Sequence, residues 1–130
     1  MPFDNTIYIQ ELTGAQVRLA LEQGLRRNRV TQVSGIRFSY DPSRPELQRV
    51  VSLTLADHGP LDDAKTYRVA CNNFMATGGD EYDALAGGRN RHDTGLTVRD
   101  ALEEHLRSLA KDGAIDFATD GRIQKLGDAL

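Results

Sequence analysis

The twelve residues from 71 to 82, CNNFMATGGDEY, combine side chains that can recognise a small molecule. Phe74 supplies a large aromatic ring, the Gly78–Gly79 pair follows it, and Asp80 supplies a carboxylate. Glycines let the backbone adopt positive φ and let a ligand approach closely. The stretch therefore indicates a recognition site. The alternative, that Phe74 is a core residue and the two glycines form a plain turn, stays open at this stage.

The remainder of the sequence offers no second constellation with catalytic or metal-binding spacing. His58, His92 and His105 are not spaced as H-x-x-x-H or C-x-x-C ligands. Cys71 is the single cysteine, which excludes an internal disulfide and a multi-cysteine metal site. The serine-hydrolase elbow, the P-loop and the dinucleotide-binding fingerprint are absent. From the residues alone, we expect a binding or structural domain.

Length and composition are those of one ordinary globular domain. The chain has 130 residues, 39% hydrophobic and 27% charged, with a formal net charge of -3. We expect a single domain over residues 1–130 without a linker. The net negative charge gives no argument for nucleic acid or an anionic membrane as a partner. No apolar run reaches the length of a membrane span.

The order of secondary-structure signals predicts antiparallel strands and two amphipathic helices. Thr13 is a suitable N-cap for the first helix, and Thr97 for the second. Three successive strand-like runs with turn-rich joints favour an antiparallel meander over repeated βαβ units. The glycine-rich residues 87–95 are predicted to be a surface loop. The strand-like runs are residues 6–12, 33–40, 49–55 and 66–70.

A basic run, Arg26-Arg27-Asn28-Arg29, follows the apolar face of the first predicted helix. We expect it in the last helical turn, where cations oppose the negative end of the helix dipole. A phosphate-binding patch is the functional alternative.

Several stretches in sequence order resemble the C-terminal domain of the 5'-nucleotidase family. The most specific is N-F-x-x-x-G-G-D-x-[YF], and the shared order covers nearly the whole chain. The resemblance implies an α+β fold with mixed, mostly antiparallel sheet layers flanked by helices, in an α/β/β/α-like arrangement. The matching stretches are PFDNT (2–6), ELTGAQ (11–16), VSGIRFSYD (33–41), PSRP (42–45), YRVA (67–70) and NFMATGGDEY (73–82).

The same resemblance implies a nucleoside site. Phe74 and Phe3 would be the two rings that sandwich the base, and Asp80 would accept hydrogen bonds from the ribose hydroxyls. Asn73 would be a nearby polar contact, and Gly78–Gly79 would let the ligand approach. Stacking contributes about 1–3 kcal/mol per base and tolerates base identity, so broad base specificity is expected.

Family members are secreted, periplasmic or surface hydrolases of nucleotides, and this sequence lacks two of their parts. The N-terminal metallophosphatase domain with its two divalent metal ions is absent, as is the Asn-Gly-Gly-Gly-Ile-Arg stretch. The resemblance therefore implies a truncated domain that binds nucleosides or nucleotides weakly. Without the metals it should not hydrolyse phosphate esters. A non-catalytic interaction module that kept only the fold is the alternative, and family members that act on thiosulfate groups are a third option.

Removal of an upstream strand would leave an unpaired sheet edge, and exposed edges pair with other chains. We therefore predict a homodimer or strand-exchanged assembly. Sedimentation velocity should show a concentration-dependent shift to the dimer. A single monomeric species at high concentration would contradict this prediction.

Overall fold

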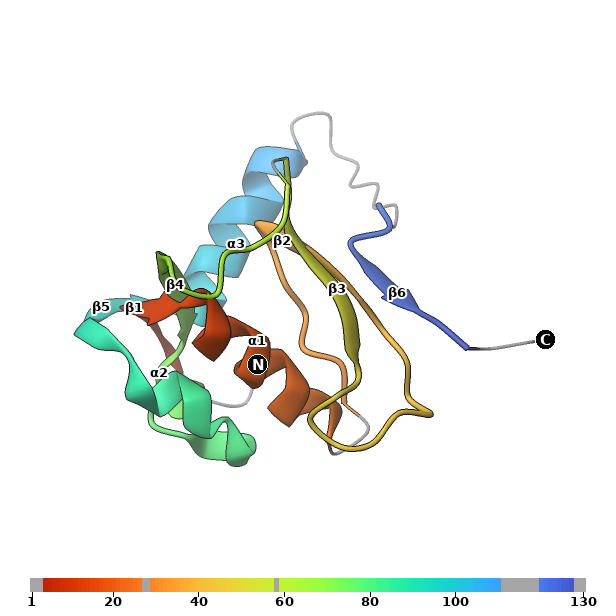
Figure 1. Ribbon diagram of the computed structural model, residues 1–130. Coiled ribbons are helices and arrows are strands. Elements are labelled where there is room, and N and C mark those ends of the chain that lie inside the picture. The colour runs from red at the N-terminus through yellow and green to blue at the C-terminus, as the bar shows by residue number, and fades with distance from the viewer. Residues whose placement is uncertain (1–3, 27–28, 58, 111–119, 128–130) are drawn as a thin grey trace.

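The computed structural model describes residues 4–26, 29–57, 59–110 and 120–127 (Figure 1). In chain order the elements are β1 (Thr6–Thr13), α1 (Gly14–Leu25), β2 (Ile36–Tyr40), β3 (Val50–Leu55), β4 (Thr66–Asn72), α2 (Asn73–Ala76), the 3-10 helices η1 (Gly79–Glu81) and η2 (Asp83–Gly87), β5 (Arg89–Thr97), α3 (Val98–Leu109) and β6 (Ile123–Lys125).

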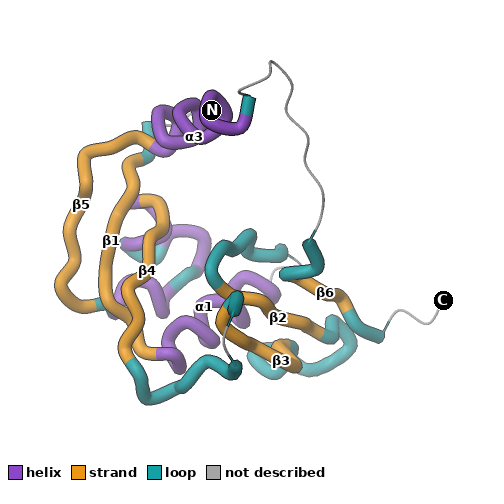
Figure 2. The backbone as a smooth tube through the Cα atoms, turned by 90° about the horizontal axis from the view of Figure 1, so that it is seen from above, coloured by secondary structure: helices purple, strands orange, loops and turns teal. Residues whose placement is uncertain are grey.

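The described strands form two three-stranded sheets, and α1 lies between them (Figures 1 and 2). The first sheet has the order β4-β1-β5 and is antiparallel throughout. The second has the order β3-β2-β6, with β2 antiparallel to β3 and parallel to β6. The predicted α+β class with mostly antiparallel strands is confirmed.

Helix α1 begins where the sequence predicts and serves both sheets. The hydroxyl of Thr13 accepts from Gln16 N at 3.2 Å, and the Gln16 side chain accepts from Thr13 N at 2.8 Å, which completes a capping box. Leu21 and Leu25 pack with second-sheet residues in one core cluster, and Ala20 packs in another. The first cluster contains Leu21, Leu25, Phe38, Val50, Leu53 and Leu61; the second contains Leu12, Ala20, Tyr82, Ala84 and Leu85.

The predicted meander is wrong in its last strand. β2 and β3 form the expected antiparallel pair, with Phe38 opposite Leu53. β4 leaves this sheet and pairs with β1, where Ala70 lies opposite Ile9. The connector between β3 and β4 is anchored by the buried Leu61. Apolar alternation shows that a strand has a buried face, but it does not identify the neighbouring strand.

The predicted surface loop over residues 87–95 is also wrong, because most of it is β5. This strand is largely exposed and polar, so it lacks the apolar alternation that indicates a strand. Its register with β1 shifts twice, and Asn90 and Gly95 have φ of 50° and 75°. Irregular pairing of this kind is typical of bulged edge strands.

The described residues of the basic run, Arg26 and Arg29, lie after α1 and not in its last turn, because the helix ends at Leu25 and Arg26 is its C-cap. Arg49 Nη1 donates to the Leu25 carbonyl at 2.9 Å and so satisfies one of the last carbonyls of the helix. Arg27 and Asn28 lie outside the described residues. The sequence also predicts an extended piece that begins near Ile115 and Phe117, and these two residues lie outside the described residues as well.

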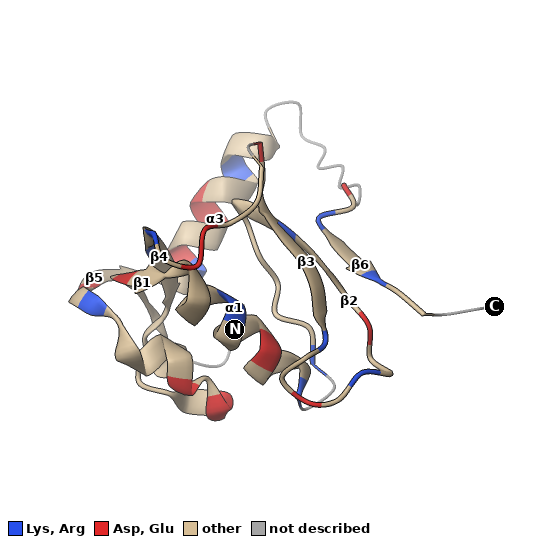
Figure 3. Cartoon of the chain, viewed as in Figure 1, with Lys and Arg blue, Asp and Glu red and all other residues tan. Residues whose placement is uncertain are grey.

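Helix α3 has the predicted N-cap, since Thr97 Oγ1 accepts from Asp100 N at 3.0 Å. It lies at one end of the first sheet, as Figure 2 shows, and Leu102 and Leu109 on its apolar stripe are exposed. Within the described residues, no helix has both the length and the apolar character needed to span a membrane. In the view of Figure 3, basic and acidic residues are interspersed over helices and strands.

Glu22 joins α1 to the second sheet through two backbone bonds. The residue is buried, and its carboxylate accepts from Arg49 N at 2.9 Å and from Val50 N at 3.0 Å. Both donors belong to the start of β3 and its preceding residue. The carboxylate therefore fixes where β3 begins relative to the helix.

We predict that Glu22→Ala lowers the free energy of unfolding by about 3 kcal/mol, because it leaves two backbone donors without acceptors. Urea denaturation followed by circular dichroism measures the loss. Glu22→Gln should also destabilise, since its amide nitrogen faces a donor. Glu104→Ala, on the exposed face of α3, is the matched control. Equal stability of the Glu22 and Glu104 variants would contradict the prediction.

Candidate functional site

The candidate site is the segment that follows β4. Asn72 caps α2, its Oδ1 accepting from Met75 N at 2.7 Å. The Asn73 Oδ1 accepts from Thr6 N at 3.2 Å, at the start of β1. The polar pair therefore holds the short helix at the end of β4 and ties it to the first residue of the neighbouring strand.

Phe74 is not a core residue. The residue is 50% exposed, and its ring lies against the backbone of Gly79. A Cβ at Gly79 would come within 2.5 Å of the Phe74 ring and 2.6 Å of the Phe74 carbonyl oxygen. Gly79 is therefore the residue that lets the chain fold back beneath the ring, leaving the rest of the aromatic side chain open to solvent.

The chain then makes a left-handed turn that extends beyond the glycines. Gly78 has φ of 93°, which glycine adopts without penalty. Asp80 and Glu81 have φ of 56° and 67°, a conformation that costs L-residues about 1–2 kcal/mol each. Tyr82, only 5% exposed, anchors the far end in the core.

Asp80 is exposed and lies beside Arg29, which belongs to the connection between α1 and β2. Its side chain is 53% exposed, and its Oδ2 lies 3.4 Å from Arg29 Nη1. Arg29 also donates through Nη2 to the Asp80 carbonyl. The Arg29 guanidinium lies 5.2 Å from the centroid of the Tyr82 ring, and the Tyr82 hydroxyl bonds with Thr31 Oγ1 at 2.6 Å.

Arg91 connects β5 to backbone carbonyls of α2 and η2. Nη1 donates to the Leu85 carbonyl at 3.0 Å and to Gln10 Oε1 at 2.8 Å, and Nη2 donates to the Ala76 carbonyl. The guanidinium also lies 5.1 Å from the centroid of the Tyr8 ring. These bonds hold α2 and η2 at fixed positions relative to the first sheet.

Cys71 lies next to this network as a half-buried thiol. Burial raises the pKa of Cys71 above its ordinary value, against smaller lowering effects of the Gln10 hydrogen bond and the Arg91 charge. A raised pKa disfavours the thiolate, which is the reactive form. This environment favours a packing role for Cys71 over a nucleophilic one.

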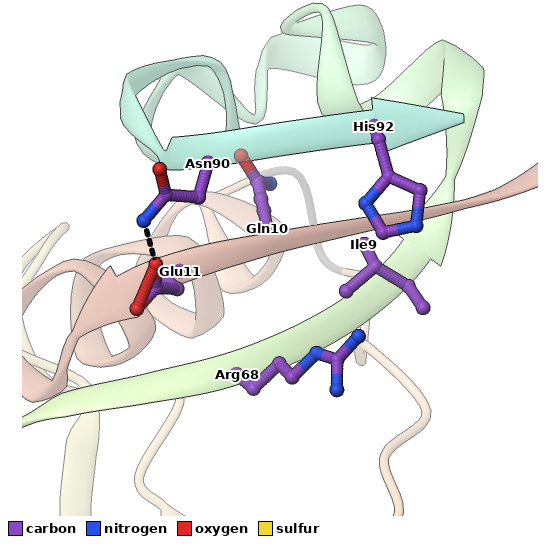
Figure 4. A pocket seen from close by; sticks show the side chains of 6 residues that line it. All are labelled: Ile9, Gln10, Glu11, Arg68, Asn90 and His92. Atoms are coloured by element: carbon purple, nitrogen blue, oxygen red, sulfur yellow. Dashed lines mark hydrogen bonds between the residues drawn. The ribbon is translucent and has the colours of Figure 1, made fainter. Parts of the chain in front are cut away.

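A separate hollow of about 200 Å³ lies on the outer face of the first sheet (Figure 4). In it the Asn90 amide donates to Glu11, and Arg68 lies opposite Glu11 in the β1–β4 register. His92 and Ile9 occupy the other end. The lining residues are Ile9, Gln10, Glu11, Arg68, Asn90 and His92.

Asp93, the residue after His92 in β5, is not among the residues that line this hollow. Asp93 uses Oδ2 to accept from Thr6 Oγ1 at 2.8 Å and Oδ1 to accept from Gly95 N at 2.9 Å. The Gly95 backbone bond and the Thr6 hydroxyl lower the pKa of Asp93. Its carboxylate is therefore occupied in ordering the β5 backbone.

Five of the six sequence-predicted site residues lie together on this segment: Asn73, Phe74, Gly78, Gly79 and Asp80. Phe3 lies outside the described residues. Sequence reasoning missed Arg29, whose contact with Asp80 spans 51 positions. The basic run was its only signal, and that run suggested a helix end or a phosphate patch. Across the described ranges, no three His, Cys, Asp or Glu residues are grouped as metal ligands.

Comparison with known proteins identifies the family. Residues 1–87 match the family model of the 5'-nucleotidase C-terminal domain. The chain belongs to this family. The resemblance on which the site residues were predicted is thereby confirmed for the domain as a whole.

Individual relatives agree with this assignment. The chain is 32% identical to the trifunctional nucleotide phosphoesterase YfkN of Bacillus subtilis and 30% identical to a snake venom 5'-nucleotidase of Macrovipera lebetinus, over 97% and 100% of its length. It spans only 9% and 34% of those two proteins.

Solved structures show the same relation. A 5'-nucleotidase precursor from Thermus thermophilus superposes with a TM-score of 0.87 at 35% identity, covering 98% of this chain and 26% of that one. The NAD nucleotidase of Haemophilus influenzae superposes with a TM-score of 0.76 at 26% identity, over 96% of this chain and 25% of that one. The chain thus corresponds to about a quarter of each of these two longer proteins.

We predict that Gly79→Ala displaces the Phe74 ring and lowers the free energy of unfolding by about 1–3 kcal/mol, because the new Cβ would overlap the ring and its carbonyl. Aromatic proton shifts of Phe74 and urea denaturation measure the two effects.

Gly78→Ala is the matched comparison. Its new Cβ would lie 3.7 Å from Ala86 Cβ, in ordinary contact, so only the positive φ is penalised. This variant should destabilise without moving the Phe74 ring. Unchanged ring shifts in Gly79→Ala would show that Phe74 does not rest on Gly79.

Proposed function

We propose that this chain is the nucleoside-recognition part of a 5'-nucleotidase-type phosphoester hydrolase. Phe74 stacks on the base, and Asp80 accepts hydrogen bonds from the ribose hydroxyls. Asn73, Gly78 and Gly79 shape the segment that carries both groups. The observation that supports this proposal most directly is the half-exposed Phe74 ring, which lies on Gly79 and is followed six residues later by the exposed carboxylate of Asp80.

The chemistry of the two side chains suits a nucleoside. An open aromatic face attracts any base, since every base has a π-face. A carboxylate that accepts from two vicinal hydroxyls makes charge-assisted hydrogen bonds. Asp80 Oδ2 faces Arg29, and Oδ1 has no bond to any described residue, so the carboxylate retains acceptor capacity.

The second ring of the proposed sandwich is Phe3. The Thr6 N–H, three residues further along, bonds with Asn73 at 3.2 Å, directly before Phe74. The strand start that follows Phe3 is therefore adjacent to the segment that carries Phe74. This proximity supports the pairing of Phe3 with Phe74 across a base.

Hydrolysis would require a second domain. We propose that the full-length protein supplies an N-terminal metallophosphatase domain with two divalent metal ions, and that the present domain delivers the nucleotide to it. Two metals can activate the attacking water and stabilise the leaving oxygen. The names of the relatives, which include venom 5'-nucleotidases and a precursor, support an extracellular or periplasmic location.

The alternative, an interaction module that kept only the fold, does not require an exposed ring and an exposed carboxylate on one strained segment. Phe74 is half-exposed over Gly79, and Asp80 has a positive φ although it is not a glycine. Residues of this kind are concentrated at ligand-binding segments, which favours ligand recognition over the module.

We predict that adenosine shifts the ring resonances of Phe74 in NMR titrations of the chain. Phe74→Ala should weaken binding by about 1–3 kcal/mol, the usual contribution of one stacked base. Leu102→Ala, which removes another exposed apolar side chain on α3, is the control and should leave the affinity unchanged. Saturating adenosine without any Phe74 shift would refute base stacking at this site.

A further inference from the structure

We infer that Arg29 is the positioning residue for Asp80: it holds the carboxylate and its left-handed backbone in the orientation that receives the ribose hydroxyls. This inference rests on the proposed nucleoside function. It assigns a role to a residue from the loop after α1, 51 positions away from Asp80 in the sequence.

Arg29 contacts Asp80 at two points at once. Nη1 lies 3.4 Å from the carboxylate Oδ2, and Nη2 donates to the carbonyl of the same residue. A planar guanidinium can make both contacts from one fixed plane, whereas an ammonium group makes them as a point charge. Two anchors on one residue restrict both its side-chain rotamer and its backbone.

The guanidinium is itself held in place from below. Its carbon lies 5.2 Å from the centroid of Tyr82, which is buried and bonded through its hydroxyl to Thr31 at 2.6 Å. Tyr82 is therefore fixed in the core, the Arg29 guanidinium packs on Tyr82, and Asp80 in turn contacts Arg29. Arg29 is 34% exposed in its side chain, so the ion pair is only partly screened by water.

The backbone that Arg29 contacts needs such support. Asp80 and Glu81 both have positive φ, and neither is a glycine. Such residues persist where the surroundings determine them, and they are concentrated at ligand-binding segments. Glu81 has its own ion pair, with Arg26 Nη2 at 3.7 Å. Two arginines that follow α1, Arg26 and Arg29, thus contact the two positive-φ residues of the segment.

The position of Arg29 leaves one of its own hydrogen-bond donors unsatisfied. Its Nε is buried and has no hydrogen-bond partner in the part of the chain that the structure describes. Unsatisfied buried donors are rare and call for an explanation. The other contacts of the guanidinium explain this one. Its two terminal nitrogens face Asp80 and its plane lies near the Tyr82 ring, so these contacts fix the orientation of Nε as well.

The test compares two ligands that differ only at the sugar, adenosine and 2',3'-dideoxyadenosine, in NMR titrations of the full chain. Wild type is expected to prefer adenosine, and Asp80→Asn should remove that preference. Arg29→Gln should weaken adenosine binding about fivefold, within the range of coupled neighbouring residues, and leave dideoxyadenosine binding unchanged. The double variant should bind like Asp80→Asn alone.

Arg18→Gln is the matched control, because it removes a similar exposed ion pair, with Asp63 at 3.2 Å, away from the segment. Arg29→Lys should recover only part of the adenosine affinity. If Arg29→Gln does not fold, the wild-type Nε–H signal of Arg29 serves instead. It should shift with adenosine and not with dideoxyadenosine.

The outcomes separate the two proposals. No adenosine preference in wild type would overturn ribose recognition by Asp80 and the role of Arg29 with it. A normal wild-type preference that Arg29→Gln leaves intact, or equal losses for both ligands, would overturn only the role of Arg29. Additive losses in the double variant, or a wild-type Nε–H signal that ignores the sugar, would do the same.

Discussion

The pairing of β1 with β4 is the contact on which the candidate site depends. It places the end of β4 beside the start of β1, so that Asn73 accepts a hydrogen bond from Thr6 across 67 positions. Without this register, the start of β1 and the Phe74 segment would not be neighbours. Strand β4 therefore pairs with β1 and not with β3, the strand that precedes it in the sequence.

Helix α1 turns that strand pairing into a single folded unit. It packs apolar residues against both sheets, and its capped start follows β1 without a linker. Its buried Glu22 fixes the beginning of β3. The residues that follow the helix reach the site segment, where Arg26 and Arg29 contact Glu81 and Asp80. The helix therefore positions the site from one side while β1 positions it from the other.

The site segment combines rigid and costly features in a short length. The Phe74 ring lies against the backbone of Gly79, and Asp80 and Glu81 adopt positive φ although neither is a glycine. The buried Nε of Arg29 has no hydrogen-bond partner among the described residues. Departures from local preference at one place are expected where function and not stability determines the residue. In a member of the 5'-nucleotidase C-terminal domain family, that place is the one we propose for the nucleoside.

The sequence by itself determined the local elements and the content of the segment. Thr13 and Thr97 marked both helix starts, alternation marked β2 and β3, and the Phe-Gly-Gly-Asp order marked the candidate site, because these signals depend on neighbours within a few positions. The tertiary structure decided which distant segments come into contact. It assigned β4 to β1, made a polar, bulged strand of β5, and brought Arg29 to Asp80. These outcomes depend on contacts between residues far apart in the chain, for which a single sequence holds no short-range pattern.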